Sequence, residues 1–120
     1  MIYSSYFAKV NKIPYDWYGI CRRPPKFVVD RNVYELAPSG DLLNRYKSGK
    51  ISLPAYFNYF YDELTAKKDI ITDKIDSLLI KSADIVLCCY ERDYLSCHRK
   101  VVLEFLENNG YMVGGELHIL

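Results

Sequence analysis

The sequence predicts a single α/β domain spanning residues 1–120, with a small, mostly parallel or mixed sheet flanked by helices. The apolar run Ile85 to Cys89 has the length and the β-branched content of a buried strand. A polar loop follows it, and then apolar residues recur at helical spacing. The middle of the chain is also helical in pattern, and a chain of 120 residues makes one domain of ordinary size. Strands that alternate with helices favour a Rossmann-like, three-layer arrangement.

Three further extended segments are expected. Residues Met1 to Phe7 and Asp16 to Arg22 read as the first two strands, and the last strand lies within Tyr111 to Leu120, where a Gly-Gly pair breaks or bulges it. Fewer than a dozen residues separate the first two strands, whereas a parallel crossover normally needs a dozen or more. Either one short helical turn makes the crossing or the two strands are antiparallel.

Four helices are expected between and after these strands. The first runs from Asp41 to Lys47, and Ser52 caps a longer one that has a proline in its first turn. A third begins at Thr72 or Asp73. The fourth has Ser96 as its N-cap and ends at Asn109 and Gly110, so that Cys97 and His98 lie in its first turn. The second carries an aromatic stripe, which suits a packed core better than a base-stacking pocket.

The loop before the fourth helix contains several residues of the types that act in catalysis and anion binding. Unpaired N–H groups and the positive end of the dipole meet at a helix N-terminus, which favours an anion or a thiolate. A cysteine placed there can have its pKa lowered to roughly 3.5–7.5. Cys97 is therefore a candidate nucleophile, with Glu91 and His98 as acid/base candidates, while Arg99 offers a bidentate fork for carboxylate or phosphate.

Three of these residues keep a structural alternative. Cys97 is either a functional thiol or a structural cysteine. Glu91 is either a general base or ribose-hydroxyl acceptor, or it holds Arg22 or Arg99 in an ion pair. His98 is either a general acid or base, or it hydrogen-bonds the loop and fixes its shape.

A rigid basic turn follows the second strand. Two prolines after Arg22 and Arg23 hold the backbone extended there. Ligands of open α/β sheets bind beyond the carboxyl ends of the strands, so the arginines and Glu91 are expected in one crevice. Ser4 and Ser5 of the first strand and Tyr90 complete the candidate ligand-binding residues.

The four cysteines have neither the spacing of a disulfide scaffold nor that of a zinc site, and they are expected to be reduced thiols. Cys88 and Cys89 are adjacent on a strand, so their side chains face opposite sides of the sheet and cannot bind one metal ion together. We expect no metal site and no cofactor, because the usual dinucleotide and triphosphate loops are also missing.

The net charge of +1 conceals an uneven distribution. Residues 1–50 contain nine Lys and Arg against four Asp and Glu, whereas residues 51–120 contain seven against eleven. Such an asymmetry either marks a face that binds phosphate or nucleic acid, or belongs to an ordinary solvated surface. No apolar run is long enough for a membrane span and no signal peptide is recognisable, so a cytoplasmic protein without a membrane partner is expected. The sequence does not indicate an oligomeric state.

The loop residues resemble the domain of unknown function 488 family. That family is marked by a strand ending in Cys-Tyr-Glu or similar and by Cys-His-Arg at the start of a helix, which correspond to 89–91 and 97–99 here. The resemblance extends to the stretches beginning at Tyr3, Leu36 and Tyr46. Where family members usually carry Asp-x-Arg, this chain has Ile20-Cys21-Arg22, so only the arginine matches. The resemblance implies an α/β fold and a site at these motifs, and it supplies no reaction.

Two functions fit these observations. One is an enzyme acting on a nucleotide, a nucleic-acid base or another small anionic substrate at the Cys-His-Arg loop. The other is a non-catalytic module that binds nucleotide or nucleic acid through the basic first half and exposed tyrosines.

Overall fold

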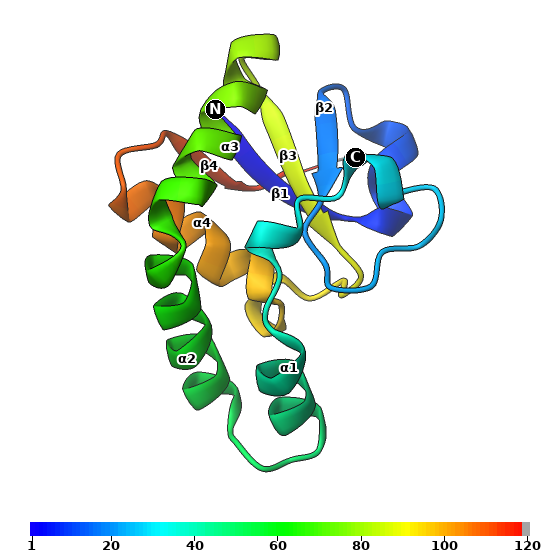
Figure 1. Ribbon diagram of the computed structural model, residues 1–120. Helices are drawn as coiled ribbons and strands as arrows, with labels where there is room; N and C mark the ends of the chain where they lie inside the picture. Colours follow the sequence, from blue (N-terminus) through cyan, green and yellow to red (C-terminus); the bar gives the residue numbers. More distant parts are fainter. Residues whose placement is uncertain (119–120) are drawn as a thin grey trace.

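A four-stranded, fully parallel sheet organises the protein. The computed structural model describes residues 1–118, and its strands lie in the order β2-β3-β1-β4 (Figure 1). The strands are β1 (Ile2–Tyr6), β2 (Asp16–Gly19), β3 (Ile85–Cys89) and β4 (Val113–Glu116). The two predicted first strands do not pair with each other, because β3 lies between them. A short 3-10 segment, η1 (Phe7–Lys12), makes the crossing, which settles the alternative that the sequence left open.

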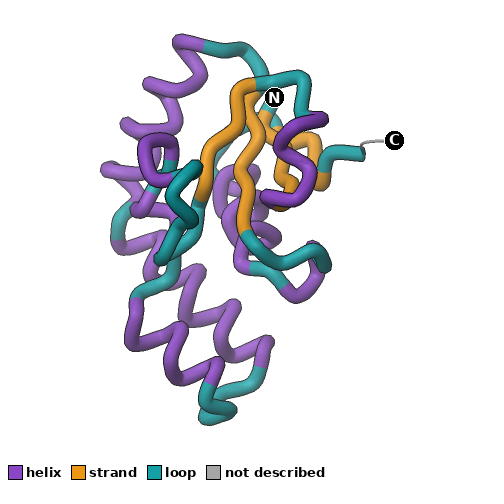
Figure 2. The backbone as a smooth tube through the Cα atoms, turned by 90° about the vertical axis from the view of Figure 1, so that its right-hand side faces the viewer, coloured by secondary structure: helices purple, strands orange, loops and turns teal. Residues whose placement is uncertain are grey.

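Helices cover both faces of this sheet, as the α/β prediction requires. The α-helices are α1 (Gly40–Lys47), α2 (Leu53–Ala66), α3 (Lys68–Lys81) and α4 (His98–Asn108), and the other 3-10 segments are η2 (Val29–Arg31), η3 (Tyr34–Leu36) and η4 (Tyr94–Ser96). Figure 2 shows the strands between the long helices and the shorter helical segments. All four α-helices share one core with Ile85, Leu87 and Cys89 of β3, whereas Val86 and Cys88 pack with η1 on the opposite face. The predicted opposite orientation of the two adjacent cysteines is confirmed.

The starts of α1 and α2 follow the capping rules. Ser39 accepts a hydrogen bond from the Leu42 amide, and Ser52 accepts one from the Ala55 amide. The start of α3 was predicted too late, because the chain re-enters a helix directly after a turn at Lys67. No glycine or proline marks that turn, and the fully buried Ile71 anchors the first turn of α3 against the core.

The predicted start of α4 is one residue too early. Ser96 lies in η4 and donates its hydroxyl hydrogen to Asp93 Oδ2, at 2.8 Å, instead of capping the helix. Asp93 caps η4 by accepting a hydrogen bond from the Leu95 amide. The side chains of Asp93 and Ser96 are thus bonded within η4 and do not cap α4. Cys97 therefore occupies the N-cap position in an extended conformation, and His98 is the first helical residue.

The last strand is shorter than predicted and carries the expected bulge. Ile2 pairs with Val113 and Tyr3 pairs with Gly115, so Gly114 is skipped. A side chain at Gly114 would collide with the Tyr3 ring, which explains the glycine. Residues 119 and 120, which the prediction placed in this strand, lie outside the described residues. None of the helices within residues 1–118 is both long enough and apolar enough to cross a membrane.

Candidate functional site

A pocket of about 370 Å³ opens beyond the carboxyl ends of β2 and β3, which is where the crevice was predicted. The loops that follow these two strands form one side of it, and α1 with the first turn of α2 forms the other. Its lining residues are Cys21, Arg22, Arg23, Pro38, Gly40, Leu43, Asn44, Tyr46, Lys47, Tyr56, Tyr90, Glu91, Ser96 and His98. The predicted site residues Arg22, Arg23, Tyr90, Glu91 and His98 thus come together.

Three cationic side chains line this pocket. Arg22 and Arg23 come from the basic turn after β2, and Lys47 comes from the end of α1. Within the described part of the chain, no carboxylate lies at ion-pair distance from any of the three. Lys47 was missed as an individual residue, although the basic first half of the sequence pointed to this region. The pocket therefore presents three positive charges that form no ion pair within residues 1–118, together with the carboxylate of Glu91.

The backbone that carries Arg22 is fixed by side chains. Asn32 accepts from the Cys21 amide at 3.2 Å and donates to the Cys21 carbonyl at 2.9 Å. The Ile20 carbonyl, one residue earlier, lies 2.6 Å from His98 Nε2. These bonds act like strand pairing beyond the end of β2, so the basic turn leaves the sheet in a defined direction.

His98 makes the loop-fixing hydrogen bond that one of its two predicted roles requires. A carbonyl only accepts, so Nε2 carries the hydrogen of this bond, and Nδ1 of the neutral ring has a free lone pair 3.8 Å from Cys97 Sγ. Burial lowers the pKa of His98 below its ordinary value of 6.5, so the ring is neutral at pH 7. The bond to Ile20 fixes the loop, and the same bond orients Nδ1 towards a sulfur.

Glu91 faces the pocket without the expected arginine partner. Its Oε2 atom lies 3.6 Å from Cys97 Sγ, and no arginine nitrogen in residues 1–118 forms an ion pair with its carboxylate. The predicted ion pair with Arg22 or Arg99 is wrong, because the Arg22 guanidinium lies against Gly40 and Arg99 binds Glu116 instead. Tyr90 beside it donates its hydroxyl hydrogen to the Arg23 carbonyl at 2.8 Å, which ties the two pocket loops together.

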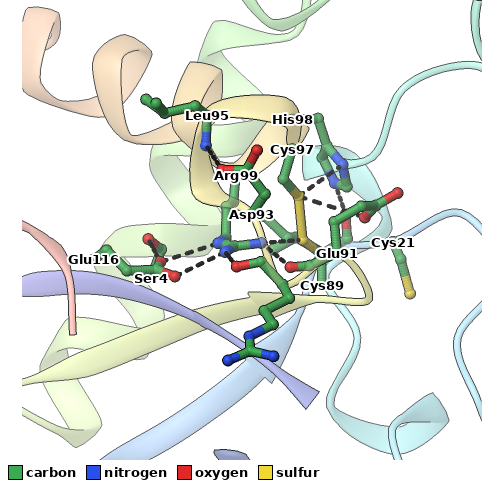
Figure 3. The surroundings of a disulfide bond; sticks show 12 residues. Ser4, Cys21, Cys89, Glu91, Asp93, Leu95, Cys97, His98, Arg99 and Glu116 are labelled. Carbon is green, nitrogen blue, oxygen red and sulfur yellow. Dashed lines mark hydrogen bonds and ion pairs between the residues drawn. A yellow bond between two sulfur atoms is a disulfide. The ribbon is translucent and has the colours of Figure 1, made fainter. Parts of the chain in front are cut away.

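Arg99 belongs to a buried polar network behind the pocket (Figure 3). Its side chain is fully buried, and its guanidinium binds both carboxylate oxygens of Glu116, at 3.0 and 2.7 Å. It also donates to the carbonyls of Glu91 and Arg92, and Ser4 donates to Glu116 at 2.6 Å. Arg99 and Ser4 therefore do not line the pocket.

One predicted residue, Ser5, and one residue that was not predicted, Glu116, remain to be described. Ser5 is buried in β1 and does not line the pocket either. Glu116 was missed, because a lone acid at the end of a predicted strand carries no signal of its own.

Cys89 and Cys97 are joined by a disulfide behind Glu91 and His98 (Figure 3). The expectation of four reduced thiols is therefore wrong for this pair, because the strand end and the helix N-terminus bring the two sulfurs together. Both residues are almost completely buried, and Arg99 Nη1 lies 3.0 Å from Cys89 Sγ. The sulfurs of both and a ring nitrogen of His98 lie within 4.8 Å of one another, a grouping that the spacing argument missed.

The other two cysteines are free and buried. Burial raises the pKa of Cys21 to about 11 and that of Cys88 to about 12, so both are protonated at pH 7.

A family model covers most of the chain. The model described as "Active DUF488-N3 subclade" matches residues 5–110, a region that contains every candidate site residue except Ser4. No curated protein and no solved structure matched the chain in the other two comparisons. Because the family match extends over far more than half of its residues, the chain belongs to the domain of unknown function 488 family.

Proposed function

We propose that this protein is a cytoplasmic enzyme that acts on a small anionic substrate, of which a nucleotide is the best candidate. The observation that carries the proposal is the single pocket in which the unpaired cations of Arg22, Arg23 and Lys47 lie beside Glu91 and His98. Enzyme pockets commonly have volumes of roughly 300–1,000 Å³, and this one falls in that range. The word "Active" in the family description favours the enzymatic form of the proposal.

The cations would bind the phosphate groups of the substrate. Arginine forms bidentate, charge-assisted hydrogen bonds to phosphate, and lysine adds a point charge. Tyr46, whose ring stacks on the buried Tyr56 with the ring centroids 4.5 Å apart, offers an aromatic surface on the other side of the pocket for the remainder of a nucleotide. Charge on one side and aromatic surface on the other match the two halves of such a ligand.

The acid/base work falls to Glu91 and His98. The Glu91 carboxylate faces the pocket, where it can accept a proton from a hydroxyl or a water molecule. His98 Nδ1 lies within reach of a hydrogen bond from the thiol of Cys97 once the disulfide is reduced, so it can take the proton of that thiol. In this scheme Cys97 is the nucleophile or a polarised thiol, and the anion-binding residues hold the substrate.

One observation favours the second candidate, a module that binds nucleotide or nucleic acid without catalysis. Cys97 is buried and bonded to Cys89, and its sulfur is not part of the pocket lining. A binding module needs only the cations and the aromatic surface, which are both open to the pocket. Binding to single-stranded nucleic acid would weaken steeply as salt increases.

Anion binding is tested by titrating nucleoside monophosphates and inorganic phosphate into the protein by calorimetry. Each charge-assisted hydrogen bond contributes roughly 1.5–3 kcal/mol, so the double variant Arg22→Ala/Arg23→Ala should bind at least about 100-fold more weakly. Lys26→Ala is the matched control, since Lys26 belongs to the same basic turn but does not line the pocket. Equal affinity in the double variant and in the Lys26 variant would refute the anion site.

Catalysis is tested by a substrate screen on reduced protein with nucleotides, nucleosides and single-stranded oligonucleotides. For any substrate that turns over, Cys97→Ser and Glu91→Gln should each lower kcat by at least about 100-fold while the affinity changes little. Cys88→Ser is the control, because its thiol faces the other side of the sheet. Full turnover in Cys97→Ser would exclude nucleophilic catalysis by that residue, and binding without turnover of any compound would leave the binding module as the function.

A further inference from the structure

We propose that Cys89, Cys97 and His98 form a binding site for one divalent, zinc-like metal ion in the reduced protein. The three residues come from two elements that meet behind the pocket, since Cys89 ends β3 and the other two begin α4. Their sulfur and nitrogen atoms all lie within 4.8 Å of one another. Zinc takes thiolate and imidazole ligands at about 2.3 and 2.0–2.1 Å, which places neighbouring ligand atoms roughly 3.5–3.8 Å apart. A small adjustment of the side chains therefore suffices to surround an ion.

The hydrogen bond of His98 provides independent support. A histidine that binds a metal ion usually donates its other ring N–H to a carbonyl or carboxylate, which fixes the ring and the tautomer. Here Nε2 lies 2.6 Å from the Ile20 carbonyl, and Nδ1 points towards Cys97 Sγ at 3.8 Å. The nitrogen that remains free is thus the one directed at the sulfurs.

The charges around the three ligands also favour a dication. Two thiolates would lie close to the carboxylate of Glu91, which is 3.6 Å from Cys97 Sγ. Arg99 donates to Cys89 Sγ at 3.0 Å, but its own charge is already matched by the two-pronged bond to Glu116. The cluster therefore carries excess negative charge when both thiols are ionised, and a bound dication offsets it.

Metal binding and the disulfide are alternative states of the same two cysteines. A dithiol or phosphine reductant supplies the two electrons that open the S–S bond, two protons convert the sulfurs to thiols, and metal binding then releases these two protons. The Cα atoms of Cys89 and Cys97 are 7.7 Å apart, beyond the usual disulfide range of about 4.4–6.8 Å. Two sulfurs that share a metal ion lie further apart than two bonded sulfurs, so the wider backbone spacing suits the metal-bound state.

Three protein ligands leave a fourth coordination position. His98, which belongs to the cluster, and Glu91, which lies beside it, both line the pocket, so this position borders the pocket rather than the core. Three-ligand zinc sites with an open position are typical of catalysis, whereas structural sites are closed by four. The metal site does not depend on the proposed anion binding, because Arg22, Arg23 and Lys47 take no part in it.

Metal binding is measured on the full-length protein after reduction with a phosphine. We expect one cobalt(II) ion per chain, with the intense thiolate-to-metal absorption and the d–d bands of a tetrahedral site, and displacement by zinc. Native mass spectrometry checks the stoichiometry. Cys89→Ser and Cys97→Ser should each weaken binding by more than about 100-fold, since the loss of a ligand exceeds the 10–100-fold effect of an outer partner.

Cys88→Ser is the matched control, because Cys88 is the neighbour of Cys89 on the opposite face of β3. It should bind cobalt as tightly as the unmodified protein, and circular dichroism confirms that each variant is folded. Cys89→Ser also distinguishes the metal site from the proposed nucleophilic role of Cys97. It removes a metal ligand and should abolish cobalt binding, whereas it leaves the Cys97 nucleophile in place. The absence of thiolate bands in the reduced protein, or equal weakening by Cys88→Ser and Cys89→Ser, would overturn the proposal.

Discussion

Arg99 and Arg22 lie at the same edge of the sheet, yet their surroundings are opposite. Arg99 is fully buried and binds Glu116, two carbonyl groups and a cysteine sulfur. Arg22 is exposed in the pocket and, within residues 1–118, has no anionic partner. A buried charge is stable only when it is paired and hydrogen-bonded, whereas an unpaired exposed charge is free to bind a ligand. The comparison teaches that the first arginine holds the fold and the second is available for function.

The largest expected effect lies on the buried side of this comparison. Glu116→Ala leaves the Arg99 guanidinium buried without its carboxylate, so we expect the free energy of unfolding to fall by about 3–5 kcal/mol. Urea denaturation measures the change. Glu104→Ala is the control, because Glu104 forms an exposed ion pair with Lys100, and loss of such a pair costs about 0.5 kcal/mol or less. Equal destabilisation by both variants would show that the Arg99 network does not hold the fold.

A substitution in the pocket should have the opposite effect, since it should weaken ligand binding and leave the stability of the fold unchanged. Lys47→Ala removes one of the three pocket cations, and we expect phosphate or nucleotide affinity to fall about tenfold, which corresponds to about 1.4 kcal/mol. The free energy of unfolding should stay within about 0.5 kcal/mol. Lys50→Ala is the matched control, because Lys50 is exposed nearby and does not line the pocket. A drop in stability without loss of affinity would assign Lys47 to the fold.

The sequence could predict local patterns better than long-range partners. The buried run of β3, the cap at Ser52 and the bulge near Gly114 follow from periodicity and from glycine and serine chemistry. The position of the pocket follows from the rule that ligands bind beyond strand ends. The ion-pair partner of Arg99 could not be predicted, because Glu116 lies 17 residues further along the chain, on a strand whose position in the sheet was unknown.

The cysteine pair was missed for a similar reason. Cys89 looked like a core thiol because it ends an apolar strand, and strand alternation was applied correctly to it and Cys88. The spacing of eight residues to Cys97 matches no common motif, and only the loop path that η4 fixes brings the two sulfurs together. Loop geometry of this kind depends on bonds such as those of Asp93, which composition does not reveal.

A smaller effect is expected from pH, through the histidine that lies between the two regions. Burial lowers the pKa of His98 in the folded protein below its ordinary value of 6.5, so below pH 6.5 the unfolded chain binds a proton that the folded protein does not. The contribution of neutral His98 to the free energy of unfolding is therefore complete above the pKa of the unfolded chain. It falls as the pH decreases towards the lower pKa of the folded protein, by up to about 1.4 kcal/mol per pH unit. Denaturation of metal-free protein between about pH 7 and pH 5 measures the slope.

The matched variant for this test is His98→Gln, whose amide can still donate to the Ile20 carbonyl but does not titrate. The slope over this pH interval should flatten in the variant. An unchanged slope would mean that other groups account for the acid sensitivity and that His98 is not held neutral by burial.

The smallest effect concerns the close approach of Gly40 to the Arg22 guanidinium. Gly40 lies under the guanidinium, and a Cβ added there would come within 3.0 Å of Arg22 Nε. The arginine is a flexible side chain, so Gly40→Ala should displace it slightly, lower nucleotide affinity about two- to threefold and change stability by less than about 0.5 kcal/mol. A double-mutant cycle gives the decisive control, because in the Arg22→Ala background the Gly40 substitution has no guanidinium to displace and should leave affinity unchanged. An equal loss of affinity in both backgrounds would mean that Gly40 acts on the pocket through the backbone of α1 instead of through Arg22.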